Sequence, residues 1–314
     1  DMQPDFIWLK QRNATQFHTL TDAARGVGKH IQSNNADGEA TNSNSGYISA
    51  FGSDGFTTTN GTANELYVNT NGSTYVGWCW NTQGGAGSSN TNGSINTTTT
   101  SVGQTQGFSI STYTGTGSNA TVGHGLGAVP EMLILKKRNA GHEWITYHHK
   151  HNATPEDYYM VLHGAGVAND NATTWQDTAP TSTVYSIGTY TDINASGGTM
   201  VAYAWRSIQG FSKFGSFIGN GNADGPFVYL GFRPAMVIVK DTGAAVGWGM
   251  YDHKRNGYND NNRTLYAHSD SGEDAGGYVN LLSNGFKITS SSAWQNRSGG
   301  TFIYMAFADS PIVN

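Results

Sequence analysis

The 314-residue chain has a single cysteine, Cys79, and few charged side chains. One cysteine excludes a disulfide within the chain, so the fold does not depend on one. Charged residues make up only 12% of the chain, the net charge is −5, and no basic stripe is visible. We therefore expect no nucleic-acid partner, because phosphate neutralisation needs clustered lysine and arginine. No apolar run approaches the length of a bilayer-crossing helix, so we predict no membrane span.

Uncharged polar residues and aromatic residues take the place of the missing charges. The chain has 42 glycines and many Asn, Ser and Thr residues, while 8 Trp, 16 Tyr and 13 Phe recur in patterned segments. Disordered chains are poor in aromatic and β-branched residues, so this composition indicates a folded protein. The many turn signals, together with the lack of a long amphipathic pattern, predict an all-β fold with a polar, mostly uncharged surface.

One motif occurs three times: a proline, two variable residues, an apolar run and a lysine. It reads PDFIWLK at residues 4–10, PEMLILK at residues 130–136 and PAMVIVK at residues 234–240. An apolar segment of this length with such boundaries is typical of a buried strand. A framework that recurs in this way predicts stacked similar units, an architecture that favours surfaces and assemblies over a single catalytic pocket.

Each copy continues with a second shared strand at a nearly constant distance from its proline. These strands read NGSTYV at residues 71–76, SGGTMV at 196–201 and SGGTFI at 298–303. An opening motif, also at a nearly constant distance before the proline, occurs only twice, at residues 107–117 and 210–221. The first copy lacks this opening piece.

These landmarks divide the chain into four parts. Residues 1–80 form a first β repeat without its opening strands, residues 81–106 a linker rich in Gly, Ser, Asn and Thr, and residues 107–209 and 210–314 two complete repeats. A complete repeat of about 100 residues has the size of a small antiparallel sandwich. We predict tandem antiparallel β-sandwich repeats of the jelly-roll or lectin-like type, in three copies of which the first is incomplete.

The missing opening strands leave a sheet edge unfilled, and such an edge is a docking site for another strand. We predict that residues 96–102, the tail at residues 310–313 or a neighbouring subunit completes it. Strand complementation of the first repeat would then support self-association into a fibre or oligomer.

Equivalent positions in the copies carry informative residues. Trp144 and Trp248 lie at the same distance after their prolines, and His18 holds that place in the first copy. Cys79 aligns with Ala204 and Ala306, which predicts a small buried core residue rather than a reactive thiol.

Residues with catalytic or metal-binding chemistry form no convincing constellation. The densest reactive cluster is His142, Glu143, His148, His149 and His151, but its spacing matches no metal motif with a clear mechanism. The carboxylates are scattered beside Gly and Asn, which is turn chemistry rather than a pair for sugar hydrolysis. We predict a protein that is not an enzyme and has no catalytic residue and no cofactor. A structural calcium ion in the loops at residues 169–171 or 259–262 is the metal alternative left open.

Several aromatic residues in polar, loop-like contexts are candidate carbohydrate platforms. A flat ring offers an apolar face to a sugar, and neighbouring Asn, Asp and Gly loops offer groups for its hydroxyls. The candidates are Trp175, Trp294, Tyr190, Tyr258 and Tyr266.

Asn-x-Ser/Thr sequons are modestly more frequent than this composition alone would give. They matter only where the source glycosylates secreted proteins. The candidate glycosylation sites include Asn60, Asn92, Asn96, Asn119, Asn171 and Asn262.

The framework motifs carry a family resemblance. Residues 4–12 (PDFIWLKQR), 72–80 (GSTYVGWCW), 107–110 (GFSI) and 211–215 (FSKFG) resemble repeat-bearing tail-fibre-like or virion-associated proteins of aquatic tailed phages. The resemblance covers essentially the whole chain. It implies a virion or extracellular appendage protein with lectin-like sandwich units, and it supplies no catalytic residues.

We therefore expect a non-enzymatic structural protein of an extracellular assembly, namely a phage tail fibre or appendage that contacts a host surface. Its expected location is extracellular or on the virion surface, with a host-surface glycan as a possible partner. Three alternatives stay open: a subunit of a cellular extracellular filament, a carbohydrate-binding module and a glycan-degrading depolymerase.

Overall fold

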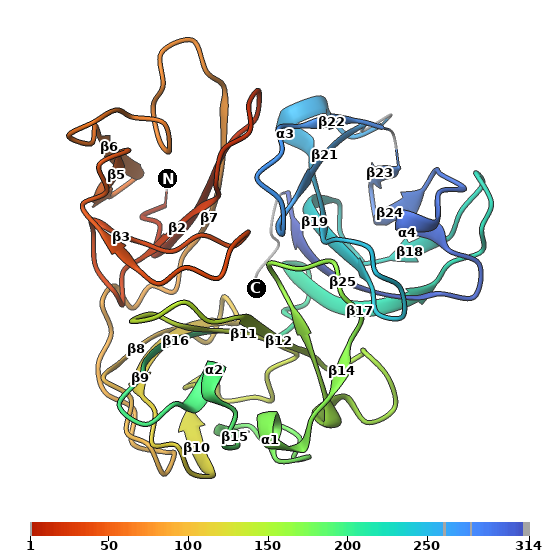
Figure 1. The fold of residues 1–314 in the computed structure, drawn as a ribbon. Coiled ribbons are helices and arrows are strands. Elements are labelled where there is room, and N and C mark those ends of the chain that lie inside the picture. The colour runs from red at the N-terminus through yellow and green to blue at the C-terminus, as the bar shows by residue number, and fades with distance from the viewer. Residues whose placement is uncertain (1, 260–261, 277, 310–314) are drawn as a thin grey trace.

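A computed structural model shows an all-β protein built of antiparallel sheets, and it describes residues 2–259, 262–276 and 278–309. Figure 1 shows three lobes of sheet arranged around a common centre. The α-helices of the described residues are single turns of four residues each. No helix in this part of the chain is long and apolar enough to cross a membrane.

Lobe 1 contains the strands between residues 6 and 80. Its main sheet has the order β2-β1-β7, and two hairpins, β3-β4 and β5-β6, accompany it. Cys79 on β7 packs against the core of lobe 1 but is only half-buried, so the prediction of a small buried core residue is confirmed in part. The strands are β1 (Phe6–Gln11), β2 (Thr19–Asp22), β3 (Lys29–His30), β4 (Ala40–Thr41), β5 (Tyr47–Gly52), β6 (Gly55–Thr59) and β7 (Tyr75–Trp80).

Lobe 2 has a main sheet of seven strands, in the order β14-β13-β12-β11-β16-β9-β8, and a second sheet, β10-β15. Its strands are β8 (Thr99–Gly103), β9 (Phe108–Thr114), β10 (Ala120–Gly123), β11 (Met132–Lys137), β12 (Trp144–His148), β13 (Tyr158–Val161), β14 (Asn169–Asp170), β15 (Val184–Ile187) and β16 (Thr199–Trp205). Its helical turns are the 3-10 turn Pro155–Asp157, α1 (Ala172–Trp175) and α2 (Thr191–Asn194).

Strand β8 lies inside the segment that the sequence analysis interprets as a linker. It pairs with β9 over five residues and forms the edge of the lobe 2 sheet. The prediction that residues 96–102 complete the first repeat is therefore wrong, because their backbone groups are used in lobe 2. The tail at residues 310–313, the second predicted donor, lies outside the described residues.

Lobe 3 has a main sheet of six strands, β17-β25-β19-β20-β21-β22, which follows the order of lobe 2 from β9 to β14, and a second sheet, β18-β24-β23. Its strands are β17 (Ser212–Ile218), β18 (Phe227–Tyr229), β19 (Pro234–Asp241), β20 (Gly249–Asp252), β21 (Arg263–Tyr266), β22 (Asp274–Ala275), β23 (Val279–Leu282), β24 (Gly285–Ile288) and β25 (Thr301–Ala308). Its helical turns are α3 (His253–Asn256) and α4 (Ala293–Asn296).

The repeated apolar motifs form β1, β11 and β19, which lie inside their main sheets. Successive side chains of a strand point to opposite faces. Met132 and Ile134 of β11 face a core shared by all lobes, while Leu133 and Leu135 face the core of lobe 2 alone. Both faces are buried, which explains why the motif is a continuous apolar run rather than an alternating one.

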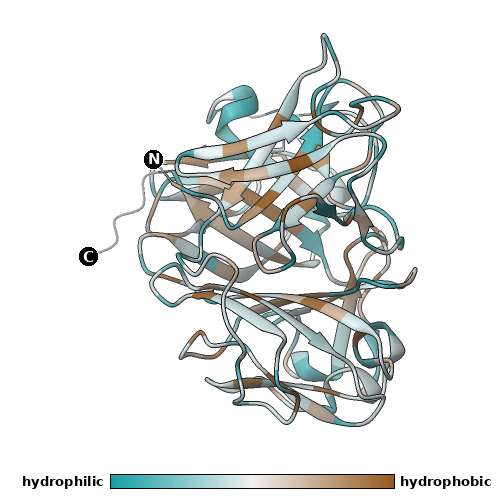
Figure 2. Ribbon diagram, turned by 90° about the vertical axis from the view of Figure 1, so that its left-hand side faces the viewer, coloured by the Kyte–Doolittle hydropathy of each residue, from teal (hydrophilic) through white to brown (hydrophobic). Residues whose placement is uncertain are grey.

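The shared core lies at the centre, where the three main sheets face one another. It draws side chains from every lobe, among them Trp8, Trp78 and Trp80, then Trp144, Tyr203 and Trp205, then Trp248, Met250 and Phe307. Figure 2 shows the most hydrophobic segments on strands and the hydrophilic ones concentrated in turns and loops. The three lobes thus form one body through this core.

A ring of three hydrogen bonds joins the lobes. Each starts at the position that the sequence analysis aligns as His18, Trp144 and Trp248. Trp144 Nε1 donates to Gln32 O at 2.9 Å, Trp248 Nε1 donates to Val161 O at 3.1 Å, and His18 Nε2 lies 3.0 Å from Tyr266 O. The Nδ1 atom of His18 accepts from Trp8 Nε1 at 2.7 Å, so its Nε2 carries the proton. Lobe 2 therefore donates a hydrogen bond to lobe 1, lobe 3 donates one to lobe 2, and lobe 1 donates one to lobe 3.

The lysine that closes each apolar motif is buried. Lys10, Lys136 and Lys240 each donate a hydrogen bond from Nζ to the carbonyl of the following residue. Burial lowers the pKa of each ammonium group to about 8. Lys136 Nζ also reaches Ala36 O of lobe 1 at 3.1 Å, so this lysine contributes to the contact between lobes 1 and 2.

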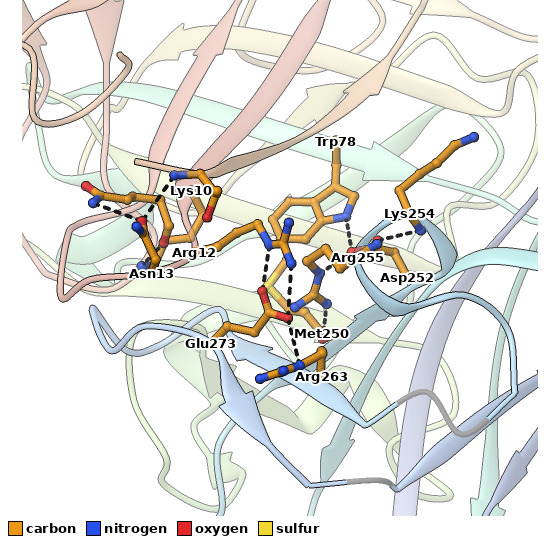
Figure 3. Close-up of polar contacts among 12 residues, drawn as sticks. Lys10, Arg12, Asn13, Trp78, Met250, Asp252, Lys254, Arg255, Arg263 and Glu273 are labelled. Atoms are coloured by element: carbon orange, nitrogen blue, oxygen red, sulfur yellow. Dashed lines mark hydrogen bonds and ion pairs between the residues drawn. The ribbon is translucent and has the colours of Figure 1, made fainter. Parts of the chain in front are cut away.

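Lobes 1 and 3 meet through a polar contact that closes the ring (Figure 3). Arg12 Nε lies 2.6 Å from Glu273 Oε2 near the surface. Deeper in the contact, Trp78 Nε1 of lobe 1 donates to Asp252 Oδ2 of lobe 3 at 3.1 Å. The same carboxylate holds Arg255, whose guanidinium lies over the Trp78 ring at 5.7 Å from its centroid.

Candidate functional site

A hollow on lobe 3 brings together two of the aromatic residues proposed as carbohydrate platforms. It lies beside β21, β22 and α4 and has a volume of about 380 Å³. Its lining consists of Tyr266, His268, Ser269, Ser271, Asp274, Tyr278, Ser292, Trp294 and Gln295.

The single turn α4 directs Trp294 outward. Ser292 caps the turn, with its side chain accepting a hydrogen bond from Trp294 N at 3.3 Å. Gln295 and Asn296 are buried on the other side of the turn, and Asn296 Nδ2 donates to Ser290 O at 2.8 Å. Trp294 remains 45% exposed, an uncommon state for so large an apolar side chain.

Three rings meet at steep angles in the hollow. The Trp294 and Tyr266 ring centroids are 5.7 Å apart with the planes at 60°, and those of Tyr266 and His268 are 5.6 Å apart at 74°. Edge-to-face packing of this kind fixes the orientation of aromatic rings. Tyr266 therefore supports Trp294 from the side, which limits the motion of an exposed indole.

The hollow contains one carboxylate, Asp274, beside the neutral side chains of Tyr266 and His268. Burial, followed by the nearby Asp274 carboxylate, raises the pKa of Tyr266 to about 12. Burial, followed by Lys240, lowers the pKa of His268 to about 4, so this ring is neutral at pH 7. His268 Nδ1 accepts from Trp248 N at 3.3 Å, which assigns the ring proton to Nε2.

This combination suits a sugar ring. An exposed indole face packs against the C–H face of a pyranose, while a carboxylate accepts hydrogen bonds from two neighbouring hydroxyls. Serine hydroxyls and the His268 Nε2–H add neutral donors and acceptors. Hydrolysis of a glycosidic bond uses a pair of carboxyl groups, whereas the lining residues supply Asp274 alone.

Trp175 does not belong to any surface platform, so its proposed role is wrong. It is only 2% exposed and packs edge-to-face on Tyr147 in the core of lobe 2. Its Nε1 donates to Tyr158 O at 3.0 Å. A sugar cannot reach either face of a ring buried in this way.

Tyr190 and Tyr258 are half-buried and lie at separate places. The Tyr190 hydroxyl is 3.2 Å from the Tyr159 hydroxyl, and its donor bond to Glu143 Oε2 is 3.4 Å long. Tyr258 stacks on His253 with the ring planes at 7°, and its hydroxyl donates to Asp309 at 2.6 Å. Both rings are committed to neighbours within their own lobes, so neither joins the Trp294 hollow.

Lobe 2 carries different residues at the places equivalent to Trp294 and Tyr266. Asp192 of α2 stands where α4 carries Trp294, and Val161 of β13 stands where β21 carries Tyr266. Asp192 there forms an ion pair with His142. The aromatic pair is thus a feature of lobe 3 rather than of the shared framework.

The polar residues of the hollow were not predicted from the sequence. Asp274, His268 and Tyr278 come from loops and a two-residue strand, and the sequence gives no spacing signal that joins them to Trp294. The available signal was the comparison of copies, because a tryptophan at a position that is aspartate in lobe 2 indicates a residue not needed by the framework.

The histidine cluster is divided between two surfaces of lobe 2. His142 pairs with Asp192, whereas His148 and His149 each approach a backbone carbonyl of lobe 3 at 3.1 Å. Among the described residues, no three His, Cys, Asp or Glu side chains are grouped to hold a metal ion. Residues 260–261 of one proposed calcium loop lie outside the described residues.

The candidate glycosylation sites are accessible to different degrees. Asn171 is half-buried, and its side chain accepts from Thr173 N at 2.9 Å at the start of α1. A glycan there would compete with this cap. The exposed members are Asn60, Asn92, Asn96, Asn119 and Asn262.

Comparison with protein families assigns the chain to one family. Residues 1–311 match the family described as a domain of unknown function, DUF7483, and the chain belongs to it. Comparisons with curated proteins and with solved structures give no match.

Proposed function

We propose that this chain is a non-enzymatic, glycan-binding structural protein of an extracellular assembly, such as a phage tail fibre or appendage that contacts a host surface. The observation that carries the proposal is the exposed Trp294, supported by Tyr266 above a hollow with one carboxylate. In this proposal each lobe is a sandwich of the jelly-roll or lectin-like type, and lobe 3 presents the binding site.

Two further observations support an attachment role. Lobes 1, 2 and 3 are joined by a common apolar core and a ring of hydrogen bonds, so a ligand on lobe 3 meets a rigid body. The low charge of the chain also suits a neutral polysaccharide surface better than a charged polymer. The proposed location is therefore outside the cell or on a virion.

The test is binding of the full chain to a panel of bacterial surface polysaccharides and to a glycan array. Trp294→Ala removes the platform, and truncation of a central aromatic anchor costs about 2 kcal/mol, which is about a 30-fold rise in Kd. Tyr266→Ala should also weaken binding, because Trp294 loses its lateral support.

Tyr229→Ala is the matched control, since Tyr229 is 61% exposed in the same lobe but does not line the hollow. It should bind as the unmodified chain does. Equal loss in Tyr229→Ala and Trp294→Ala, or no binding to any polysaccharide, would refute the glycan site. Release of reducing ends from a bound polysaccharide would refute the non-enzymatic part.

A separate experiment tests the assembly. Antibodies raised against the chain and imaged by electron microscopy should label fibres or appendages of virions. Label on filaments of cells would instead support the alternative of a cellular extracellular filament. Label confined to the cell interior would refute both.

A further inference from the structure

Within the part of the chain that the structure describes, lobe 1 lacks two strands that the other lobes have. In lobe 2, β9 lies beside β16 and β10 beside β15, and in lobe 3, β17 lies beside β25 and β18 beside β24. The equivalent strands of lobe 1 are β7 and β6. Within the described residues, β7 pairs with β1 alone and β6 pairs with β5 alone. In each of the other two lobes, one continuous segment pairs with both of these strands: β9 and β10 in lobe 2, and β17 and β18 in lobe 3. We call it the completing segment. Both sheets of lobe 1 thus end at the edges that this segment occupies in the other lobes.

The outer edge of β7 presents a row of backbone groups. Hydrogen-bonded pairs alternate along an antiparallel ladder. Arg12 N donates to Thr74 O, so Val76, Trp78 and Trp80 direct their N–H and C=O groups toward β1. The intervening residues of β7 therefore direct their N–H and C=O groups away from β1, to the side that β9 and β17 occupy in the other lobes.

The core of lobe 1 is covered only in part. The completing segment buries Tyr113, Ala120, Val122 and Leu126 in lobe 2, and Phe217, Val228, Leu230 and Phe232 in lobe 3. Among the residues that the structure describes, none takes the place of these four in lobe 1, and Phe51, Phe56, Tyr67, Tyr75 and Cys79 of its core stay partly exposed. The positions equivalent to Cys79 show the difference, since Ala204 is 2% and Ala306 is 0% exposed.

All three lobes have an asparagine at the position that holds the completing segment in lobes 2 and 3. Asn69, Asn194 and Asn296 lie at the same distance before the threonine at the start of the last strand of their lobe. The backbone N–H of each asparagine also donates a hydrogen bond to the carbonyl oxygen four residues earlier, which closes the same turn in each lobe. Asn194 accepts from Thr116 N at 2.8 Å and donates to Ser118 O at 2.7 Å. Asn296 makes the same two bonds to the turn of lobe 3.

Lobe 1 has no such turn beside Asn69 among the residues that the structure describes. The Asn69 side chain is exposed and makes no hydrogen bond within the described residues. The neighbouring Gly72 keeps a φ of 75°, close to the 70° of Gly197 and the 72° of Gly299. In the complete lobes, the N–H groups of those two glycines donate to the completing segment. The backbone of lobe 1 therefore has the conformation that binds the completing segment in the other lobes.

A hollow of about 540 Å³ lies beside the end of β7, between Trp80, Phe108 and Phe211. In lobe 2, Phe108 of the completing segment stacks on Trp205 with ring centroids 4.8 Å apart. Trp205 is the equivalent of Trp80. An aromatic residue in the same position of a lobe 1 segment would therefore lie in this hollow beside Trp80, whose ring also stacks on Phe6 with centroids 5.2 Å apart.

We propose that lobe 1 is a receptor for a donor segment from outside residues 1–314, with the chemistry of residues 107–126. That segment contains no acidic residue, lysine or arginine; it consists of a strand with aromatic residues near both ends, a Gly-x-Gly turn and a second short strand. A second copy of the chain is not the donor, because Tyr113 and Val122 are buried in their own lobe and would have to leave its core.

Cys79, the one cysteine of the chain, reports on the docking. Its thiol is half-buried at the open core, and burial raises its pKa to about 11. The experiment measures the rate of maleimide labelling of the full chain at pH 8 with increasing concentrations of a peptide of residues 107–126. We expect the peptide to slow labelling about tenfold at saturation. A peptide with Phe108→Ser and Tyr113→Ser should give no protection.

A grafted chain removes the dependence on peptide affinity. In this chain, residues 107–126 are copied directly before Asp1. The copied Gly107 then lies as far before Pro4 as Gly107 lies before Pro130. The graft should slow labelling about tenfold without peptide and raise the thermal midpoint. Asn69→Ala should weaken this protection, whereas Asn92→Ala, which changes an exposed asparagine of lobe 2, should not.

Two results would overturn the proposal. One is unchanged labelling of Cys79 with both the peptide and the graft. The other is protection of Cys79 in a concentration-dependent dimer of the unmodified chain, which would assign the edge to a second copy.

Discussion

The contact that closes the ring between lobes 1 and 3 depends on a buried carboxylate. Arg255 Nε lies 2.5 Å from Asp252 Oδ2, and the two side chains are 1% and 4% exposed. Asp252 also accepts from Trp78 Nε1 of lobe 1, and Arg255 donates to Met250 O at 2.7 Å. We predict that Asp252→Asn, which removes the charge and keeps the shape, is among the most destabilising conservative changes in the chain.

The magnitude follows from the burial of the pair. Removal of one partner of a buried ion pair leaves an uncompensated charge and costs about 3–5 kcal/mol. Unfolding entropy of about 2.1 cal/mol/K per residue gives roughly 0.7 kcal/mol/K for a chain of this length, so the thermal midpoint should fall by about 5–8 °C. Asp252→Leu combined with Arg255→Met should recover most of the loss, because no buried charge remains.

Lobe 1 supplies a matched comparison in Asp22 and Arg25, which form the same pair with the same spacing. Arg25 also lies 3.2 Å from Glu39 Oε2, so Asp22→Asn leaves it one carboxylate. Its loss should be smaller by about 1 kcal/mol or more. Urea and thermal unfolding of both variants, with the exposed Asp54→Asn as control, measure the difference. A loss below about 1 kcal/mol for Asp252→Asn, or a larger loss for Asp22→Asn, would refute the reasoning.

Three further outcomes test other parts of the fold. Burial lowers the pKa of His148 to about 3, so between pH 3 and 6.5 the unfolded chain binds the proton and the folded chain does not. Stability should therefore fall as pH drops below 6.5, by about 1.4 kcal/mol per pH unit from this residue, and His148→Gln should flatten the urea-unfolding pH profile. Trp144→Phe should cost about 1–3 kcal/mol because Gln32 O loses its donor, and an unchanged urea midpoint would contradict the ring of bonds. Asn296→Ala should cost about 2 kcal/mol or more, whereas Asn69→Ala should cost little in the same assay; equal losses would argue against an unfilled turn in lobe 1.

The sequence predicted the all-β character and located its central strands, because both depend on local patterns. The apolar run that ends in Lys136 forms β11, and its equivalents form β1 and β19. The common spacing of Trp144 and Trp248 marked equivalent positions correctly. It did not reveal that each indole bonds the neighbouring lobe, because spacing along a chain contains no information on which sheets face one another.

The candidate site was predicted in part, for a similar reason. Trp175 and Trp294 both lie in short polar segments and both fall on single helical turns. Trp175 is the last residue of α1 and points into the core, whereas Trp294 is the second residue of α4 and points outward. A change of two positions on a turn reverses the direction of a side chain. The sequence therefore gave the two tryptophans equal weight.

The closed ring has a consequence for synthesis on the ribosome. Trp78 finds its hydrogen-bond partner Asp252 at a distance of 174 residues along the chain. At a translation rate of about 5–20 residues per second, roughly 10–35 s pass between the synthesis of Trp78 and that of Asp252. During that time the aromatic residues that lobe 1 contributes to the shared core remain exposed to solvent. Nascent chains paused within lobe 3 should therefore be the forms of this protein that chaperones bind and that aggregate first.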